Sequence, residues 1–195
     1  MSFYAYHAGD TVPPVILVVA ATEREVESVL GAERLVCGIG PIEAALATAR
    51  ALAECRPRLV LHIGIAGAQT LPPPSLVLGS EAIYADAIDP GSVFPRITSV
   101  AADAGLLAAA QAALPAAHVL PIATTGRVGG GTVAEVEAME GFGVLRAAAL
   151  AGVPAVEVRA ISNRVAERDR AKWQIDDALG ALSLGVATLI GALDA

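Results

Sequence analysis

Apolar runs of strand length alternate along this chain with Ala-rich stretches of helical length, and Gly or Pro separates most of them. The run "VILVVAA" is apolar at successive positions, which is typical of a strand covered on both faces. Other strands are predicted at "LVCGIG", "HVLPIATT" and "PAVEVRAIS", and at "RLVLHIGIAGA", which is expected to pass into a Gly-rich turn at Gly64 and Gly67. This alternation predicts an α/β fold.

Helices are predicted where Ala-rich segments meet suitable end signals. Pro41 suits the first position of the helix "PIEAALATARALAEC", because its missing N–H costs nothing there. The segment "GFGVLRAAALAG" is predicted as a helix closed by Gly152, and "IDDALGALSLGVATLIGAL" as a C-terminal helix that tolerates internal glycines. The segment from Leu71 to Thr98 is expected to form an extra hairpin or a loop over the site.

Length and composition favour one soluble domain spanning residues 1–195, with residues 1–13 as a flexible N-terminal extension. The net charge is −7, from 13 Lys and Arg against 20 Asp and Glu, and no basic run is present, so nucleic-acid binding is disfavoured. Hydrophobic residues make up 55% of the chain. Gly, Pro or charge nevertheless interrupts every apolar stretch before the ~20 residues of a membrane span, so no membrane partner is expected.

The start of the chain, "MSFYAYHAGDTVPP", has no basic segment, and the apolar run after it is too short for a signal peptide, so the cytoplasm is the expected location. Cys37 and Cys55 have no partners at metal-ligand spacing. They are predicted to be small core residues, and no metal site is expected. The histidines His7, His62 and His118 share no motif and receive no catalytic role.

Candidate site residues follow the predicted strands, because ligands of such sheets bind beyond the carboxyl ends of the strands. Glycines there let a backbone approach a ligand closely, and the helix starts behind them offer free N–H donors. Neither the dinucleotide fingerprint G-x-G-x-x-G nor the phosphate loop G-x-x-x-x-G-K-[ST] occurs. The candidate segments are Thr22 to Glu25, Gly38 to Gly40, Gly64 to Gly67, Thr124 to Gly131, Met139 with Glu140, and Arg159 to Asn163.

Each charged or polar candidate also has an ordinary structural interpretation. Glu25 stands three residues after Thr22, as in a capping box, and on pattern alone the capping interpretation is favoured. For Glu140, a carboxylate just ahead of a helix, the structural and functional interpretations are balanced. Arg159 also suits a strand-end salt bridge, and Asn163 suits a cap on the turn after its strand.

Several motifs together resemble the nucleoside phosphorylase and nucleosidase superfamily: "AATEREV", "CGIGPIEAALATARAL", "VLHIGIAGA", "AMEG" and "VRAISN" occur in its order and approximate spacing. Through "EAMEGFG" and "RAISNRVAERDRAKWQIDDAL" the chain most resembles the futalosine hydrolases, relatives of the methylthioadenosine/S-adenosylhomocysteine nucleosidases. The resemblance covers most of residues 15 to 193. It implies a three-layer sandwich with a central mixed, mostly parallel sheet flanked by helices. It also implies hydrolysis of futalosine to hypoxanthine and dehypoxanthinyl futalosine, a step in a menaquinone route.

The resemblance assigns roles to individual residues and implies no cofactor. Glu25 matches the acid that activates the attacking water, and Glu140 matches the residue that holds the ribose hydroxyls. Met139 is expected against the apolar sugar face. Arg159 resembles an arginine near the purine that orients Glu140, Asn163 or a water. The remaining expected substrate-binding residues are Gly67, Val128 and Ser162.

Asn163 occupies a position where the adenine-releasing nucleosidases carry an aspartic acid. An aspartic acid delivers a proton to purine nitrogen 7 and accepts from the exocyclic amine, whereas the NH2 of asparagine donates to nitrogen 7 and to a 6-oxo group. Asn163 therefore predicts a 6-oxopurine leaving group. A mismatch at this edge costs about 1–3 kcal/mol per unpaired group, so adenine nucleosides are expected to be poor substrates.

Some positions depart from the nucleosidase pattern or are left open by it. Ile65 replaces a residue that carries a hydroxyl in the relatives. Arg127 is expected near the purine or, slightly favoured, as an exposed loop charge. Trp173 is expected to pack on the site or, the favoured interpretation, on the C-terminal helix. Futalosine has a carboxylated aromatic arm, which needs a cationic subsite. The N-terminal extension, the Tyr84 to Arg96 segment and a neighbouring subunit are the candidates for that subsite.

Alternative functions are a methylthioadenosine/S-adenosylhomocysteine nucleosidase, another purine nucleosidase or phosphorylase, and, least favoured, a non-catalytic purine-binding protein. Asn163 disfavours the adenine-releasing enzyme, and Glu23 with Glu25 would repel the phosphate that a phosphorylase binds. A small-molecule nucleoside is the expected partner. A homo-oligomer, a dimer or higher, is expected from the resemblance and from the aliphatic composition.

Overall fold

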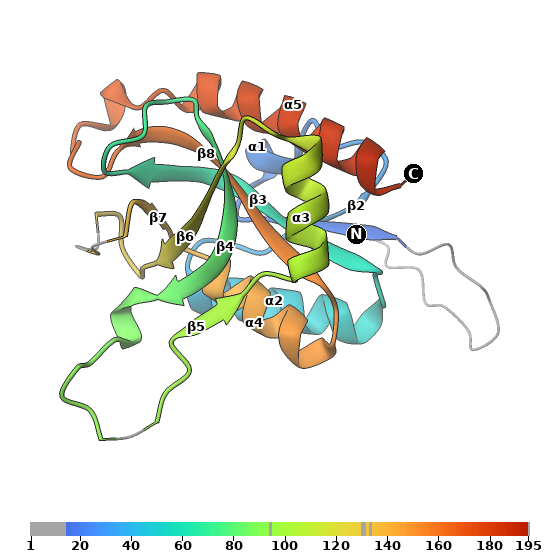
Figure 1. The fold of residues 1–195 in the computed structure, drawn as a ribbon, viewed down its shortest axis with the longest axis horizontal. Helices are drawn as coiled ribbons and strands as arrows, with labels where there is room; N and C mark the ends of the chain where they lie inside the picture. The colour runs from blue at the N-terminus through green and yellow to red at the C-terminus, as the bar shows by residue number, and fades with distance from the viewer. Residues whose placement is uncertain (1–14, 94, 130–131, 133, 195) are drawn as a thin grey trace.

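One mixed sheet organises the part of the chain that this computed structural model describes, which is residues 15–93, 95–129, 132 and 134–194. Helices cover both faces of the sheet, with α5 along one face and α2 and α4 along the other (Figure 1). The predicted sandwich with a mixed, mostly parallel sheet is therefore confirmed. The expected N-terminal extension, residues 1–13, lies outside the described residues.

The elements of the described residues follow the predicted alternation. The strands are β1 (Ile16–Ala20), β2 (Glu33–Val36), β3 (Leu59–Ala68), β4 (Leu76–Tyr84), β5 (Ser99–Ala101), β6 (His118–Thr124), β7 (Val136–Ala138) and β8 (Ala155–Arg164). The helices are α1 (Glu23–Val26), α2 (Pro41–Glu54), α3 (Ala104–Ala113), α4 (Gly141–Ala151) and α5 (Ile175–Leu193). Two 3₁₀ turns, η1 (Ala85–Ala87) and η2 (Arg170–Lys172), complete the order.

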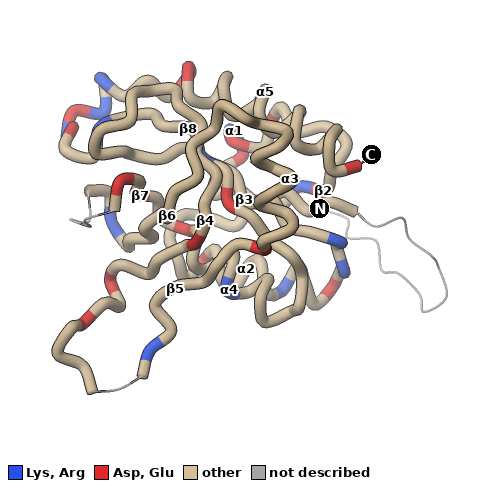
Figure 2. Tube along the Cα trace, in the orientation of Figure 1, with Lys and Arg blue, Asp and Glu red and all other residues tan. Residues whose placement is uncertain are grey.

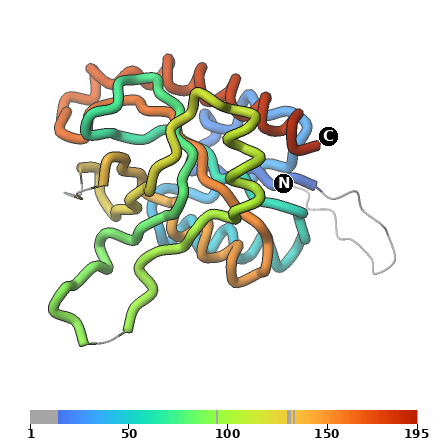
Figure 3. The backbone as a smooth tube through the Cα atoms, viewed as in Figure 1, coloured from blue at the N-terminus to red at the C-terminus, as the bar shows by residue number. Residues whose placement is uncertain are grey.

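Five strands of the sheet close into a ring, which the trace in Figure 3 follows through the centre of the molecule. β3 pairs in parallel with β8 and antiparallel with β7. β8 continues antiparallel to β4, which pairs in parallel with β6, and β6 pairs in parallel with β7. β1 and β2 extend the sheet from β3 in parallel. The carboxyl ends of β1, β3 and β8 therefore lie at one edge of the molecule.

The side chains of the central strands divide between two apolar clusters, one on each face. Val18 and Leu61 pack with residues of α3 and α5, whereas Val19 and Val60 pack with residues of α2 and α4. Each such side chain contributes about 1.5–3 kcal/mol when it is fully removed from water. Burial on both faces explains why these strands are apolar at successive positions.

α5 is the helix that carries the C-terminal part of the core. It has 19 residues and a mean hydropathy of 1.4, long and apolar enough by length and composition to cross a membrane, which is weak evidence for a span. Ala178, Leu182, Val186 and Leu189 recur every three or four residues and are buried against the sheet. This spacing is typical of a helix that packs one face against a sheet.

Most predicted element ends are confirmed. α2 begins at Pro41, and α4 ends before Gly152, whose φ of +69° is left-handed and suits glycine. The turn predicted at Gly64 and Gly67 is wrong, because β3 continues through both glycines to Ala68. The segment from Leu71 to Thr98 supplies β4, which pairs antiparallel with β5 just beyond it and so forms one arm of a hairpin.

Candidate active site

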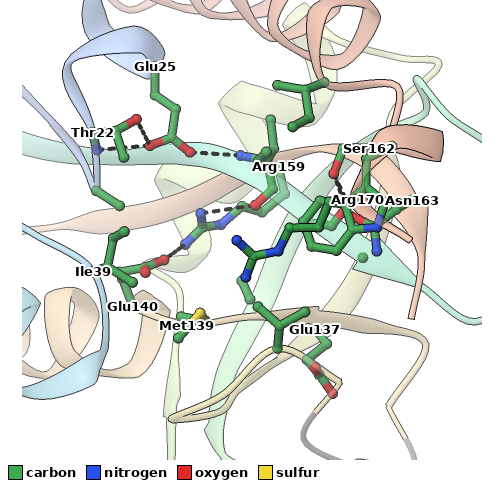
Figure 4. A pocket seen from close by; sticks show the side chains of 18 of the residues that line it. Thr22, Glu25, Ile39, Glu137, Met139, Glu140, Arg159, Ser162, Asn163 and Arg170 are labelled. Carbon is green, nitrogen blue, oxygen red and sulfur yellow. Dashed lines mark hydrogen bonds and ion pairs between the residues drawn. The ribbon is translucent and has the colours of Figure 1, made fainter. Parts of the chain in front are cut away.

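A cavity of about 420 Å³ opens at the carboxyl ends of β1, β3 and β8, beside the amino-terminal ends of α1 and α4. Figure 4 shows its side chains converging from these elements. The structure brings all the sequence-predicted site residues to the wall of this cavity. They are Glu25, Gly67, Val128, Met139, Glu140, Arg159, Ser162 and Asn163.

Glu25 is a buried carboxylate held by three donors. Its Oε2 accepts from the Thr22 backbone N–H at 3.0 Å and from the Thr22 hydroxyl at 2.8 Å. Its Oε1 accepts from the Ile65 backbone N–H at 3.1 Å. The capping interpretation is thus confirmed. The same contacts fix the carboxylate in the cavity wall, where its remaining lone pairs face the space for a ligand.

Glu140 lies immediately before α4 and is 4% exposed. Its Oε1 accepts from the Gly40 backbone N–H at 3.1 Å, and its Oε2 accepts from Arg159 Nη2 at 3.3 Å. Glu140 therefore joins the turn before α2 to β8 while it lines the cavity.

Arg159 is the centre of the buried polar contacts below the cavity. Its Nε donates to Glu157 Oε1 at 2.8 Å, and its Nη1 donates to the Ile65 carbonyl at 3.4 Å. Burial lowers the pKa of Arg159, but the carboxylates of Glu157, Glu140 and Glu25 outweigh burial and raise it. Arg159 stays charged and holds these carboxylates together.

Two members of this cluster were missed in the sequence, namely His62 and Glu157. They face each other across the parallel pair of β3 and β8, and both are fully buried. His62 Nδ1 lies 3.0 Å from the Val19 carbonyl, and His62 Nε2 lies 2.5 Å from Arg159 Nη2. Burial, and next the charge of Arg159, lower the pKa of His62 well below its usual value. The histidine is therefore neutral, with its proton on Nδ1 and an acceptor toward Arg159.

Glu157 has one oxygen engaged and one oxygen, Oε2, without a hydrogen-bond partner among the described residues. Burial raises the pKa of this carboxyl, while the neighbouring Arg159 lowers it. One signal for both missed residues was available: His62 and Glu157 each stand between apolar residues, in "LVLHIGI" and "AVEV". We call Glu25, His62, Glu140, Glu157 and Arg159 the pocket floor.

Gly64 is required by the pocket floor. A Cβ at this position would overlap the Arg159 guanidinium and lie 2.8 Å from Glu25 Oε1. At Gly67, a Cβ would lie 3.2 Å from Asn163 Nδ2. These glycines leave room for side chains from β8 and α1 that cross the surface of β3, and the pairing of β3 with β8 shifts its register between Ala66 and Gly67.

Asn163 lies near the end of β8 and is 7% exposed. Its Oδ1 accepts from the Ser162 hydroxyl at 2.8 Å, and its Nδ2 donates to the Arg164 carbonyl at 2.9 Å. The amide orientation is thereby fixed, and one N–H of Nδ2 is left for a ligand. Both of these contacts are with the neighbouring residues of β8, Ser162 and Arg164.

The remaining predicted positions divide between the cavity and the surface. Met139 is half-buried, Val128 is 41% exposed, and both line the cavity. Arg127 is exposed and does not line it, in agreement with the favoured surface interpretation. Trp173, for which packing on the C-terminal helix was favoured over a place at the site, lines the cavity. Gly130 and Gly131 of this loop lie outside the described residues.

The sequence predicts that both cysteines are small core residues and that no metal site is present. Cys37 is buried in the core, and burial raises the pKa of its thiol to about 12. Cys55, also expected in the core, is half-buried at the end of α2. Across residues 15–93, 95–129, 132 and 134–194, no group of three His, Cys, Asp or Glu side chains is arranged to hold a metal ion.

The segment between β8 and α5, residues 165–174, forms the rim of the cavity, and we call it the strap. Its side chains Val165, Arg170 and Trp173 line the cavity. Arg170 was not singled out in the sequence, because an arginine among alternating charges is typical of a solvated loop. Glu137, a buried carboxyl of β7 in the cavity wall, was also missed.

Comparisons with known proteins agree with this architecture. The family model of the phosphorylase superfamily matches residues 28–195. The futalosine hydrolase of Streptomyces coelicolor is 57% identical over 58 residues, which are 30% of this chain. The match spans only 25% of the length of that relative.

Two solved structures have the same fold. A 5′-methylthioadenosine/S-adenosylhomocysteine nucleosidase from Colwellia psychrerythraea, in complex with adenine, superposes with a TM-score of 0.80 at 19% identity, over 93% of this chain and 96% of that one. The futalosine hydrolase of Helicobacter pylori superposes with a TM-score of 0.77 at 17% identity, over 92% of this chain and 97% of that one. At these identities the likeness concerns the fold.

Proposed function

The chain belongs to the phosphorylase superfamily, and we propose that it is a nucleosidase that hydrolyses the N-glycosidic bond of futalosine, a step of menaquinone biosynthesis. The products are hypoxanthine and dehypoxanthinyl futalosine. The observation that carries the proposal is the placement of Glu25, Glu140 and Asn163 around one cavity. The 57% identity to a futalosine hydrolase over 58 residues supports the choice of substrate.

Glu25 is the general base in the proposed reaction. A water attacks the anomeric carbon as the bond to purine nitrogen 9 breaks, and the water proton passes to the Glu25 carboxylate. The Thr22 and Ile65 N–H groups hold that carboxylate in place, so no reorganisation is needed when the proton arrives. The bonding electrons leave with the purine.

Glu140 holds the ribose in this proposal. Each of its oxygens uses one lone pair on Gly40 or Arg159, and the second lone pair of each is available to a vicinal diol. Met139, in the same wall, offers an apolar surface to the sugar. Because Arg159 fixes Glu140 from below, the hydroxyls meet a preorganised acceptor.

Asn163 stabilises the leaving base. Its free N–H donates to an acceptor on the purine edge, either nitrogen 7 or the 6-oxo oxygen, because the other N–H is bound to the Arg164 carbonyl. An amide cannot transfer a proton to the base, so the purine leaves as a hydrogen-bonded anion and takes its proton from water. Donation to the 6-oxo oxygen favours hypoxanthine over adenine, because adenine carries a donor amine at that position.

The proposal is tested by incubating the purified protein with futalosine, inosine and methylthioadenosine, with and without phosphate, and measuring free base by chromatography. Hypoxanthine from futalosine at a rate independent of phosphate is the expected result. A rate that requires phosphate would identify a phosphorylase. Adenine from methylthioadenosine would contradict the role of Asn163, and binding of hypoxanthine without turnover of any nucleoside would favour a purine-binding protein.

The assembly and location belong to the same proposal: a homo-oligomer in the cytoplasm. Ile42 and Leu46 lie one turn apart on α2, with exposed fractions of 67% and 65%, and Ile39 is exposed at the cavity mouth. Apolar side chains grouped on one helix face support contact with a second copy of the chain. Light scattering on the purified protein measures the mass, and a monomer at micromolar concentration would contradict this part.

A further inference from the structure

The outer part of the cavity contains side chains that the proposed chemistry does not use. Glu25, Glu140 and Asn163 account for water, ribose and purine, and yet side chains of the strap and of α5 also line the cavity. Its outer wall combines apolar surface with two arginines. The lining residues that lie on the strap, on α5 or in contact with α5 are Arg24, Arg170, Trp173, Ile175 and Leu179.

The two arginines of this outer wall differ in their partners. Arg24 forms an ion pair with Asp176, with 2.7 Å between Nη2 and Oδ1. On the strap, Lys172 pairs with Glu167 at 3.7 Å. Arg170 has no carboxylate within ion-pair distance among the described residues, although acidic and basic residues alternate along the strap (Figure 2). Arg170 is thus an uncompensated cation at the mouth of the cavity.

Arg170 lies against an aromatic ring. Its guanidinium carbon is 5.6 Å from the centre of the Trp173 ring. In the view of Figure 4 the Arg170 side chain lies between Asn163 and Met139. Stacking on a ring leaves the N–H donors of a guanidinium at its edges free, where they match the two oxygens of a carboxylate.

The strap that carries these residues is anchored by its own hydrogen bonds. Trp173 Nε1 donates to the Glu167 carbonyl at 3.2 Å, and the Asp169 carboxylate accepts from the Ala171 N–H at 3.1 Å. The Gln174 N–H donates to the Ser162 carbonyl at 2.8 Å, one residue from Asn163. The strap therefore holds Arg170 and Trp173 in a fixed relation to the end of β8.

We propose that Arg170 and Trp173 form a subsite for an anionic, planar extension of the nucleoside, namely a carboxylate attached to an aromatic ring. The guanidinium pairs with the carboxylate, and the indole ring with the neighbouring aliphatic side chains covers the aromatic surface. This inference rests on the proposed nucleosidase function, because that function places a nucleoside in the cavity that Arg170 and Trp173 line. The described residues of the Tyr84 to Arg96 segment, one expected location of this subsite, do not line the cavity.

Arg170→Ala is the main test, with Lys172→Ala as the matched control on the same strap. The substrates are futalosine, which carries the aromatic carboxylate, and inosine, which lacks it. Removal of a charged hydrogen bond is expected to lower kcat/KM for futalosine by about 10- to 100-fold, mainly through KM. The inosine rate and the Lys172→Ala rates should stay within about twofold of wild type. Arg170→Lys should recover only part of the loss, because lysine keeps the positive charge but lacks the planar pair of N–H donors that matches a carboxylate.

Futalosine binding to the Glu25→Gln protein, measured by calorimetry, separates this inference from the proposed function. Binding that weakens when Arg170→Ala is added supports the subsite, even if the wild-type protein does not hydrolyse futalosine. Equal futalosine kcat/KM in Arg170→Ala and Lys172→Ala would overturn the subsite while leaving the nucleosidase in place. Unfolding midpoints of the variants exclude a folding defect, and absence of both binding and hydrolysis in the wild type would overturn both proposals.

Discussion

Acidic and basic side chains occur both on the pocket floor and along the strap, and their surroundings differ. On the floor, Arg159 is 1% exposed and contacts Glu157, Glu140 and His62. On the strap, Arg170 is exposed, and its one recorded side-chain contact is the Trp173 ring. Buried charges must be compensated by protein groups, whereas an exposed cation is stabilised by water until a ligand arrives.

The difference separates chemistry from substrate choice. Floor residues that are bonded to one another cannot be changed singly without disturbing the rest, so they suit steps that need fixed geometry. A strap residue that contacts little else can change at small cost to the fold, so it suits recognition of the part of the substrate that varies. The predictions below test this contrast, from the largest expected effect to the smallest.

Glu25→Gln should abolish most turnover, because the amide keeps the shape of the carboxylate and cannot accept the water proton. We expect kcat to fall by about 10²–10⁴-fold. The matched control is Glu23→Gln, an exposed residue in the same turn, which should leave kcat unchanged. A Glu25→Gln enzyme with wild-type kcat would remove Glu25 from the chemistry.

Gly64→Ala should damage the floor as a unit, since its Cβ would overlap the Arg159 guanidinium. We expect the free energy of unfolding to fall by about 1–3 kcal/mol, with loss of activity as Arg159 moves. The control is Gly191→Ala in α5, where a Cβ meets nothing within 4 Å and helix propensity should add up to about 1 kcal/mol. Denaturant titration measures the free energy of unfolding of both variants. A Gly64→Ala protein with wild-type stability and activity would contradict the contact between Gly64 and Arg159 described above.

Asn163→Asp should shift preference between bases. A carboxyl group accepts from an exocyclic amine and repels a 6-oxo group, so the ratio of futalosine to methylthioadenosine kcat/KM should fall about tenfold or more. Gln111→Glu, the same amide-to-acid change at an exposed position of α3, serves as control. No change in the ratio would show that residues other than Asn163 select the purine.

Glu157→Gln should change the pH dependence of stability. Burial raises the pKa of Glu157, and the groups facing it are Arg159 on β8, His62 on β3 and Glu140 before α4. The folded protein therefore binds this proton more tightly than the unfolded chain. Its stabilising contribution is fully present below the unfolded pKa of 4.5 and is lost as the pH rises through the higher folded value.

Glutamine cannot ionise, so Glu157→Gln should lack this loss. Urea unfolding of both proteins over about pH 4 to 8 measures the effect, with the exposed Glu33→Gln as control. The wild-type protein should lose stability relative to Glu157→Gln as the pH rises. Parallel stability curves for the two proteins would show that the Glu157 pKa is not raised.

The sequence by itself determined the alternation of strands and helices, because burial on one or both faces leaves a local periodic pattern. Pro41 and Gly152 marked helix ends through backbone preferences that act within one turn. The position of Asn163 near a strand end was also readable, and so was its chemistry as a donor. The resemblance to known motifs then added a role for Glu25 that the capping pattern alone had disfavoured.

Only the tertiary structure decided which polar groups meet. The Glu140 contact with Gly40 joins residues 100 apart, and the Arg159 contact with His62 joins residues 97 apart. The Arg159–His62 pair depends on the register of β3 against β8, and the Glu140–Gly40 pair depends on how the starts of α4 and α2 are placed, neither of which a local pattern encodes. For the same reason Gly64 appeared to be a turn residue and Arg170 a solvated charge, until the folded sheet placed one beneath Arg159 and the other at the cavity mouth.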